Sequence, residues 1–362
     1  MGSAACFQLA KRGVKTLGVE QFQLAHDMGS SWGRTRVIRK AYFEDERYVP
    51  LLHATYHRWR EIEAASGEKL LSLVGCLNLG PAGHICLRGA QRRAETHQLP
   101  YEALDKAEMI RRWPGLDPSE RDIGVFETDA GYLPPERCIA TLAKLAMASG
   151  CRILENEPVM EWSASPAGVT VKTHRAEYSA AKLIITAGPW LPKIVADLGV
   201  PLRVERQVQL WFAPPKPEFF SPQRFPVFIH FVADRAYYGI PGDDPPWVKV
   251  SRHHGGVIAT ADSVDRRIHP SDEADARWYM QRHLRGADGP RMDAKVCLYT
   301  NTTDDHFIID RHPAHESVLI AGGFSGHGFK FAPVVGEVLA DMATEQATTL
   351  PVEMFSLARL RP

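Results

Sequence analysis

Residues 318–343 read VLIAGGFSGHGFKFAPVVGEVLADMA. The first residues are apolar and predict a buried strand, the middle is rich in glycine, and the end has the spacing of a helix. Backbone N–H groups in such a turn, together with the N-terminus of the following helix, can face a polar ligand. A merely tight turn is the alternative interpretation. The stretch therefore predicts an α/β fold and a candidate binding loop.

A related pattern opens the chain. Residues 3–12 have helical spacing, Gly13 suits a helix end, and residues 16–20 (TLGVE) predict a buried strand that ends in an acid. A dinucleotide-binding fold needs a glycine turn before its first helix and an acid about 20 residues further on. Gly2 and Glu20 fit the last glycine and the acid. We expect a Rossmann-like domain whose first strand and first two glycines are absent from this sequence.

The middle of the chain has a different pattern. Residues 48–65 predict a long helix, and residues 182–190 (KLIITAGPW) predict a buried strand that runs into a tight turn. Residues 199–300 are rich in Val, Phe, Tyr and Pro with a two-residue alternation, which predicts an antiparallel sheet. Strand–helix segments at both ends therefore enclose a β-rich middle. We predict two domains whose segments interleave along the chain.

Charge and cysteine content argue against several kinds of site. Lys plus Arg equals Asp plus Glu, at 43 each, so the net charge gives no reason to expect nucleic acid or an anionic membrane as partner. The six cysteines form no C-x-x-C pair, so no zinc site is expected, and in a chain of 362 residues they favour a reduced interior. No apolar run has the length of a membrane span.

Five segments carry a more specific signal. They are TRVIRKAYFED (35–45), ITAGPW (185–190), YYGIPGDDPPWVKVSRHHG (237–255), VCLYTNTTDDHFIIDRHP (296–313) and GFSGHGFKFAPVVGEVL (323–339). Together they resemble the sarcosine oxidase family, and most closely its peroxisomal sarcosine and L-pipecolate oxidases. The resemblance implies a two-domain flavoprotein that oxidises a secondary amino acid with O₂, forms an imine that hydrolyses, and releases hydrogen peroxide.

The resemblance also implies a fold and a division of the chain. We expect an α/β FAD-dependent oxidoreductase, with a Rossmann-like FAD-binding domain and a substrate domain built on an antiparallel sheet. The FAD-binding domain is expected at 1–64, 134–202 and 296–362, and the substrate domain at 65–133 and 203–295. A small amino acid and O₂ are the expected partners of a monomer. Because the chain ends in Leu-Arg-Pro and not in a peroxisomal tripeptide, we expect a cytoplasmic protein.

The cofactor is expected to be FAD, attached through a cysteine thioether. Cys297 resembles the linking cysteine, and a thiolate is the nucleophile that this chemistry needs. From composition alone, a buried structural cysteine is the alternative. Other groups that resemble cofactor contacts are Gly2, Glu20, Thr300, Gly326 and His327. No metal ligand set is expected.

Two cations resemble the residues that bind the substrate carboxylate. Arg39 and Lys330 both have apolar neighbours, in VIRKAY and HGFKFA, which favours buried positions. A guanidinium fork and an ammonium hold a carboxylate through charge-assisted hydrogen bonds. Taken alone, an arginine or a lysine is more often a solvated surface charge. Arg36 resembles an arginine that lies close to the flavin ring.

Three further residues resemble the catalytic surroundings of the amine and of O₂. Tyr238 and His253 resemble groups that flank the substrate amine, and Lys249 resembles the lysine where oxygen is activated. A fixed cation there stabilises negative charge as it develops. A sheet tyrosine, a surface histidine and a strand-edge lysine are the alternatives. The sequence departs from the bacterial enzymes at or next to Trp32, where they have a histidine, so we expect substrate choice to differ.

Two other functions stay open at this point. The first is another flavoenzyme of the same fold, either a dehydrogenase that passes electrons to a partner or a demethylase of larger glycine derivatives. Lys249 favours the oxidase. A truncated relative without a cofactor is the second alternative, and the absent glycine turn favours it.

Overall fold

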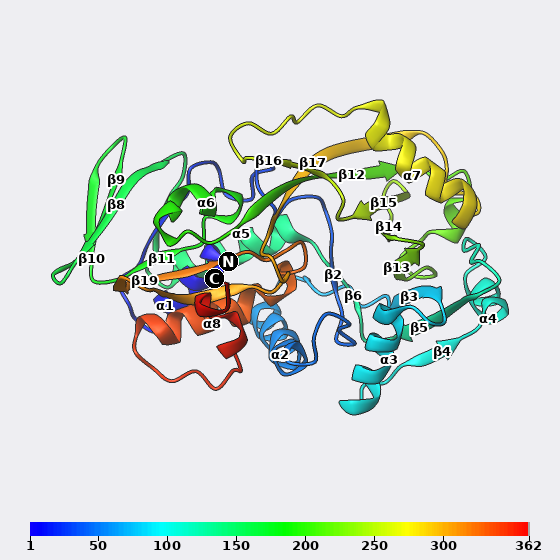
Figure 1. The fold of residues 1–362 in the computed structure, drawn as a ribbon, viewed down its shortest axis with the longest axis horizontal. Coiled ribbons are helices and arrows are strands. Elements are labelled where there is room, and N and C mark those ends of the chain that lie inside the picture. Colours follow the sequence, from blue (N-terminus) through cyan, green and yellow to red (C-terminus); the bar gives the residue numbers. More distant parts are fainter. Residues whose placement is uncertain (361–362) are drawn as a thin grey trace.

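The computed structural model describes residues 1–360 and has a two-domain α/β architecture (Figure 1). Arg361 and Pro362, which belong to the terminal tripeptide considered above, lie outside the described residues. The α-helices are α1 (Gly2–Lys11), α2 (Tyr48–Ser66), α3 (Ile85–Thr96), α4 (Lys106–Arg112), α5 (Pro135–Ala148), α6 (Leu191–Ile194), α7 (Pro270–His283) and α8 (Ala332–Ala343). None of the helices in this part of the chain combines the length and apolarity that a membrane crossing requires.

The substrate-domain side is built on a nine-stranded sheet. Its strands are β16 (Val257–Ala259), β12 (Arg203–Phe212), β15 (Trp247–His253), β14 (Arg235–Gly242), β13 (Val227–Val232), β3 (Cys76–Pro81), β5 (Asp122–Glu127) and β4 (Glu102–Leu104), with β17 (Arg291–Asn301) paired to β12. Neighbours are antiparallel except β13 and β3, which are parallel. The boundary predicted at 296 falls inside β17, which follows β12 along its whole length.

The prediction of antiparallel sheet over residues 199–300 is wrong in one segment. Residues 270–283, inside the region predicted as strands, form helix α7, which lies against β12 and β15. Pro270 stands at the first helical position, and Asp272 closes a capping box with His269. The buried positions of this helix, Ala276, Tyr279, Met280 and His283, have the helical spacing i, i+3, i+4, i+7, which the prediction of strands overlooked.

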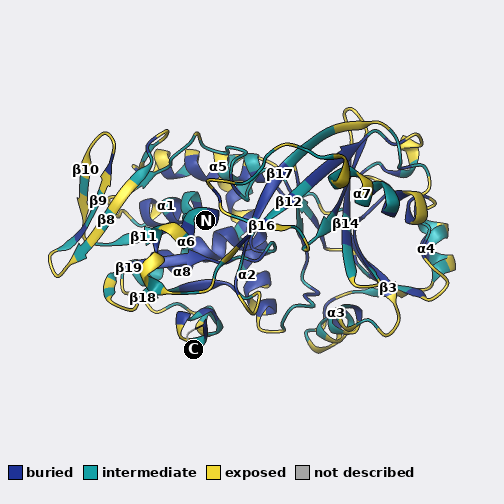
Figure 2. Ribbon diagram, turned by 45° about the horizontal axis from the view of Figure 1, so that its top comes forward, coloured by how far each residue is buried: buried dark blue, intermediate teal, exposed yellow. Residues whose placement is uncertain are grey.

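The second domain holds the smaller sheets. They pair β1 (Leu17–Val19) with β7 (Arg152–Leu154), β11 (Leu183–Ile185) with β19 (His315–Gly322) and β18 (Ile308–His312), β2 (Arg36–Ile38) with β6 (Gly131–Leu133), and β8 (Val159–Ser165) with β9 (Gly168–Thr173) and β10 (Glu177–Ala180). Within residues 1–360, β1 and β11 belong to separate sheets. Figure 2 shows α8 and the long strands mostly buried, whereas β8 to β10 form an exposed hairpin end.

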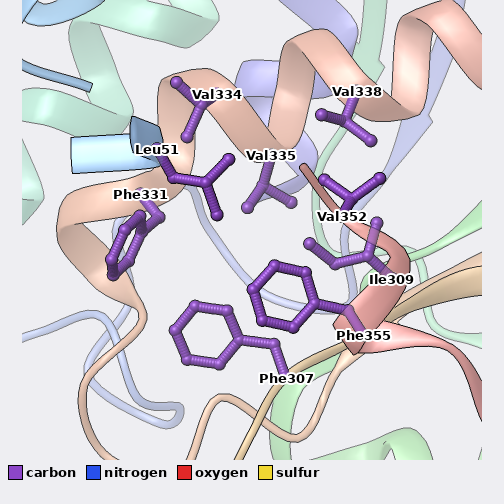
Figure 3. Close-up of a pocket in the computed structure, with 9 residues that line it drawn as sticks. All are labelled: Leu51, Phe307, Ile309, Phe331, Val334, Val335, Val338, Val352 and Phe355. Atoms are coloured by element: carbon purple, nitrogen blue, oxygen red, sulfur yellow. The ribbon is translucent and has the colours of Figure 1, made fainter. Parts of the chain in front are cut away.

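Helix packing holds in place α1 and α8, the helices of the two segments discussed first in the sequence analysis. Helix α1 packs on α5 and on α8, and Gly336 allows the approach of α8, because a Cβ there would lie 2.6 Å from the carbonyl carbon of Ala4. Where α8 begins, Phe331, Leu51, Phe307 and Phe355 face one another around an apolar cavity of about 10 Å³ (Figure 3). Loss of one such aromatic ring costs about 3–5 kcal/mol. The turn that precedes α8 is therefore rigidly anchored.

Candidate active site

Arg36, the first residue of β2, lies against Cys297 in the middle of β17. Its Nη2 is 3.6 Å from Cys297 Sγ, and the thiol is 3.7 Å from the carbonyl oxygen of Ser30. The guanidinium also donates to the carbonyl oxygens of Ser30, Trp32 and Thr35. Cys297 is 4% exposed. The sulfur is thus buried beside a positive charge that is fixed by backbone oxygens.

Lys249, in β15, is 1% exposed and lies next to this pair. Its Nζ donates to the carbonyl oxygens of Gly33 (3.1 Å) and Thr35 (3.3 Å) and to Gln209 Oε1 (2.5 Å). Burial, and after it the nearby Arg36 guanidinium, lowers the pKa of Lys249 well below its ordinary value. The three acceptors match the three N–H donors of an ammonium, so the geometry fits the charged form.

Arg39 follows β2 and is 3% exposed. Its Nη2 donates to both carboxylate oxygens of Glu44, at 2.7 and 2.9 Å, and Nη1 donates to the carbonyl oxygen of Ala41. Burial alone would raise the pKa of Glu44, but Arg39, helped by His327 and Lys330, holds it below its ordinary range. In this structure the carboxylate that Arg39 binds is therefore one of the protein's own.

Lys330 lies in the turn before α8 and is 4% exposed. Its Nζ donates to the carbonyl oxygen of His327 (2.6 Å) and to Tyr42 Oη (3.3 Å), while Trp59 Nε1 donates to the Lys330 carbonyl oxygen. Burial, and after it the Arg39 charge, lowers the pKa of Lys330 to about 7. Tyr42 Oη also lies 2.5 Å from Nδ1 of His327, whose pKa burial lowers to about 3.

A third group closes the site from the large sheet. His253 Nδ1 is 3.1 Å from Tyr299 Oη, and the rings of His253 and Tyr238 meet edge to face at 6.4 Å. Burial, followed by the charge of His254, lowers the pKa of His253 well below its ordinary value, and burial raises the pKa of Tyr238 to about 12. Gly326, with φ of 77°, lets the glycine loop lie on Tyr299, because a Cβ there would be 2.4 Å from Cε2.

Two buried hydroxyls test whether a ring-shaped cofactor fits here. Thr300 Oγ1 and Thr35 Oγ1 have no hydrogen-bond partner among residues 1–360. An unpaired buried hydroxyl costs about 1–3 kcal/mol, so such groups are expected to serve a ligand. The Thr300 carbonyl oxygen accepts from Ser325 N–H at 3.0 Å, which joins β17 to the glycine loop. Unpaired buried hydroxyls on the strand that carries the buried thiol and next in sequence to Arg36 fit the polar groups of a flavin.

The remaining two cofactor candidates lie at α1 and β1. Gly2 begins α1, and a Cβ there would be 2.9 Å from Thr186 Oγ1, just after β11. Glu20 directly follows β1, and its Oε1 accepts from Phe22 N–H at 3.0 Å and lies 3.5 Å from His26 Nε2. Their contacts to a dinucleotide stay predictions.

Reasoning from the sequence missed several residues that hold the candidates in place. Three of them, Tyr42, Glu44 and Tyr299, lie inside the quoted segments. The sequence gives their residue types but not the partners that they bind. Gln209 lies in β12, where alternate buried positions are polar. Glu127 is 1% exposed and accepts from the backbone N–H groups of residues 40 and 41, which fixes the chain after Arg39.

Comparison with known proteins agrees with this geometry. The profile of the FAD dependent oxidoreductase family matches residues 1–342. The chain is 40% identical to the monomeric sarcosine oxidase of Streptomyces avermitilis, over 99% of this chain and 95% of that protein. It is 36% identical to the N-methyl-L-tryptophan oxidase of Salmonella agona, over 99% of this chain and 96% of that protein.

Two solved structures share the fold at lower identity. NikD, an amino acid oxidase essential for nikkomycin biosynthesis, superposes with a TM-score of 0.88 at 21% identity, over 98% of this chain and 94% of that chain. The L-proline dehydrogenase of P. horikoshii superposes with a TM-score of 0.84 at 21% identity, over 99% of this chain and 94% of that chain.

Fold and site together define a flavin-dependent oxidoreductase. The chain belongs to the FAD-dependent oxidoreductase family. This finding confirms the resemblance drawn from the five quoted segments, the expected α/β two-domain fold and FAD as the cofactor.

Proposed function

We propose that this protein oxidises the carbon–nitrogen bond of a small secondary amino acid with O₂. For N-methylglycine, the amino acid, O₂ and water would give glycine, formaldehyde and hydrogen peroxide. The observation that carries the proposal is the pair of buried cations, Arg39 and Lys330, close to the neutral ring of His253. The names of the relatives, monomeric sarcosine oxidase and N-methyl-L-tryptophan oxidase, support the substrate class.

Arg39 and Lys330 bind the substrate carboxylate in this proposal. Both carboxylate oxygens of Glu44 now accept from Arg39 Nη2, so the substrate carboxylate competes with Glu44 or adds a second anion beside it. Lys330 donates to two acceptors within residues 1–360, which leaves its third N–H for the ligand. Buried charge-assisted hydrogen bonds of this kind orient the amino acid.

His253 and Tyr238 flank the amine. Because burial keeps His253 neutral, it adds no positive charge at the amine, and the amine is favoured in the neutral form that oxidation requires. Tyr299 fixes the ring of His253 through Nδ1. Trp32, whose ring meets Trp211 edge to face at 5.9 Å, stands where the sequence departs from the bacterial enzymes. We propose that this difference alters which side chain is accepted.

FAD, when bound, accepts the hydride and passes the electrons to O₂. We propose that Cys297 links it covalently through Sγ, beside Arg36. Thr300, Gly326 and His327 would hold the ring system, and Gly2 and Glu20 the pyrophosphate and ribose. Lys249 supplies positive potential where negative charge develops on oxygen.

The function is tested by its products. Purified protein would be supplied with N-methylglycine, L-pipecolate or N-methyl-L-tryptophan, and hydrogen peroxide would be measured per amino acid consumed. One peroxide per turnover is expected. Turnover only with an artificial electron acceptor would replace the oxidase with a dehydrogenase, and no flavin reduction by any N-alkyl amino acid would refute the proposal.

Covalent attachment has a separate test. Acid-precipitated wild-type protein should retain yellow flavin, whereas the Cys297→Ser variant should release it to the supernatant. Cys138→Ser, which removes another buried thiol, is the matched control and should retain the flavin. Release by the wild type would leave Cys297 as a packed core residue. We also propose a monomer, as the names of the sarcosine oxidase relatives suggest, and light scattering would measure it.

A further inference from the structure

A row of buried polar side chains lies along β12. Glu205, Gln207 and Gln209 occupy alternate positions, so they share one face of the strand, and they are 5%, 6% and 3% exposed. Gln209 Oε1 binds Lys249, while Gln207 Nε2 donates to Glu205 Oε1 at 2.6 Å. One end of the row therefore serves a residue already assigned to the site. The other end is the carboxylate of Glu205.

Glu205 has a complete set of partners. Its Oε1 accepts from Gly256 N–H at 2.5 Å and its Oε2 accepts from Asn301 Nδ2 at 2.6 Å, in addition to Gln207. Oε2 also lies 3.6 Å from His254 Nδ1. A buried carboxylate is tolerated only where such donors replace water. Burial would raise the pKa of Glu205, but His254 and Gly256 hold it below its ordinary range.

The partners of Glu205 lie next to His253 and Tyr299, at the end of the site where the substrate amine is proposed to bind. Glu205 stands opposite Tyr299 in the register of β12 and β17. The His254 ring is 4.1 Å from the His253 ring and 5.3 Å from the Tyr299 ring. Gly256 is pressed against β12, because a Cβ there would be 1.8 Å from the Arg206 carbonyl oxygen. Glu205 thus ties the turn after β15 to the strand that carries Tyr299.

We propose that Glu205 is a positioning residue that holds His254 and the turn after β15 against the His253–Tyr299 pair. The inference rests on the proposed function only for what His253 does to the substrate. Burial, and after it His254, lowers the pKa of His253, so the position of His254 matters for His253. Without Glu205, His254 would no longer be held beside the His253 ring.

Other charged or titratable groups face the two histidines. Arg252, in β15, packs on the turn at Gly255, where a Cβ would lie 2.4 Å from Nη2. Arg39, Lys330 and His327 face His253 from β2 and from the glycine loop, and each lowers its pKa after burial and His254. The phenol groups of Tyr299 and Tyr238 complete the surroundings. Glu205 is the carboxylate that pairs with His254 among the described residues.

The test is the Glu205→Gln variant, which keeps the size of the side chain and removes its charge. The ring ¹⁵N signals of His253 and His254 would be recorded by NMR on full-length holoenzyme with ¹⁵N-labelled histidine, the His254 signal being identified by its loss in His254→Gln. We expect both signals to shift in Glu205→Gln, because the side chain that holds the turn is altered. Glu161→Gln, an exposed carboxylate on β8, is the matched control and should leave both signals unchanged.

Activity gives an independent readout. The acid limb of the pH profile for flavin reduction should move to higher pH in Glu205→Gln, and Glu205→Asp, which keeps the charge, should restore much of the wild-type profile. In the double variant with His254→Gln, the Glu205 effect on the profile should vanish. Unchanged ring signals of His253 and His254 in Glu205→Gln would overturn the inference, even if the enzyme is active. If no amino acid reduces the flavin, the proposed function fails while the NMR spectra still decide the role of Glu205.

Discussion

Lys249 and Lys330 are both buried lysines, yet their ammonium groups are held differently. Lys249 donates to three neutral oxygens of the protein, whereas Lys330 donates to two and lies near the Arg39–Glu44 ion pair. All N–H donors of Lys249 are in use, so it acts on reacting atoms through its electric field. Lys330 keeps one donor for a ligand. The comparison therefore gives the two lysines different roles. Lys249 stabilises charge that develops on the reacting atoms, whereas Lys330 binds a ligand directly.

The largest effect is expected at Lys249. Lys249→Met should slow reoxidation of the reduced flavin by about 100-fold or more, because a fixed charge aimed at a developing charge is lost. Reduction by the amino acid should change far less, and stopped-flow absorbance measures both half-reactions. Lys172→Met, at an exposed position on β9, is the control for net charge. Equal slowing of both half-reactions would remove the distinction between the two lysines.

The next largest effect is expected when one of the two cations that bind the substrate carboxylate, Arg39 or Lys330, is removed. Arg39→Met or Lys330→Met should raise KM for an N-methyl amino acid by about tenfold or more, since each removes a charge-assisted hydrogen bond of about 1.5–3 kcal/mol. Steady-state kinetics with peroxide detection would measure this, and the rate of flavin reoxidation should stay near that of the wild type. Arg47→Met, a more exposed arginine of the same loop, is the control. Unchanged KM in both variants would contradict the binding role.

Carboxylate binding by Lys330 should depend on pH. The pKa of Lys330 is about 7, so its ammonium is present below that pH and is lost as the pH rises above it. The affinity for a carboxylate should therefore fall by up to about tenfold between pH 6 and pH 9. Binding of propionate to the oxidised enzyme, followed by the flavin spectrum, measures the change. In Lys330→Met this dependence should disappear, and its persistence there would assign it to another group.

The long helices and strands could be predicted from the sequence because the spacing of their apolar residues is regular. The helix predicted at 48–65 is α2, and the quoted strand, loop and helix at 318–343 are β19 and α8. Helix α7 was overlooked although Ala276, Tyr279, Met280 and His283 have helical spacing, because charged residues are interspersed among these positions. Arg206 of β12 donates to Asp272 of α7 at 2.8 Å, an interaction that no local periodicity contains.

Only part of the site could be predicted from the sequence, because its residues meet through tertiary contacts. Arg39 and Lys330 are 291 positions apart in the chain, and only the resemblance joined them before the fold was known. Glu44, five positions after Arg39, was not recognised as its partner, because a carboxylate near an arginine in sequence is usually solvated. His327 and Lys330, which after Arg39 lower the pKa of Glu44, come from the other end of the chain.

Glu44 gives the smallest and most specific effect. Glu44→Gln removes the anion that now binds Arg39, so a substrate carboxylate meets less repulsion, and KM should fall by about three- to fivefold, which corresponds to roughly 1 kcal/mol. Glu46→Gln makes the same change of net charge at an exposed position of the same loop and should leave KM unchanged. Reoxidation should be the same in both variants, because Lys249 donates to Gly33, Thr35 and Gln209 and, within residues 1–360, not to Glu44. A higher KM in Glu44→Gln would instead mean that Glu44 holds the Arg39 fork in its binding position, so that the ion pair orients the cation and does not compete with the substrate.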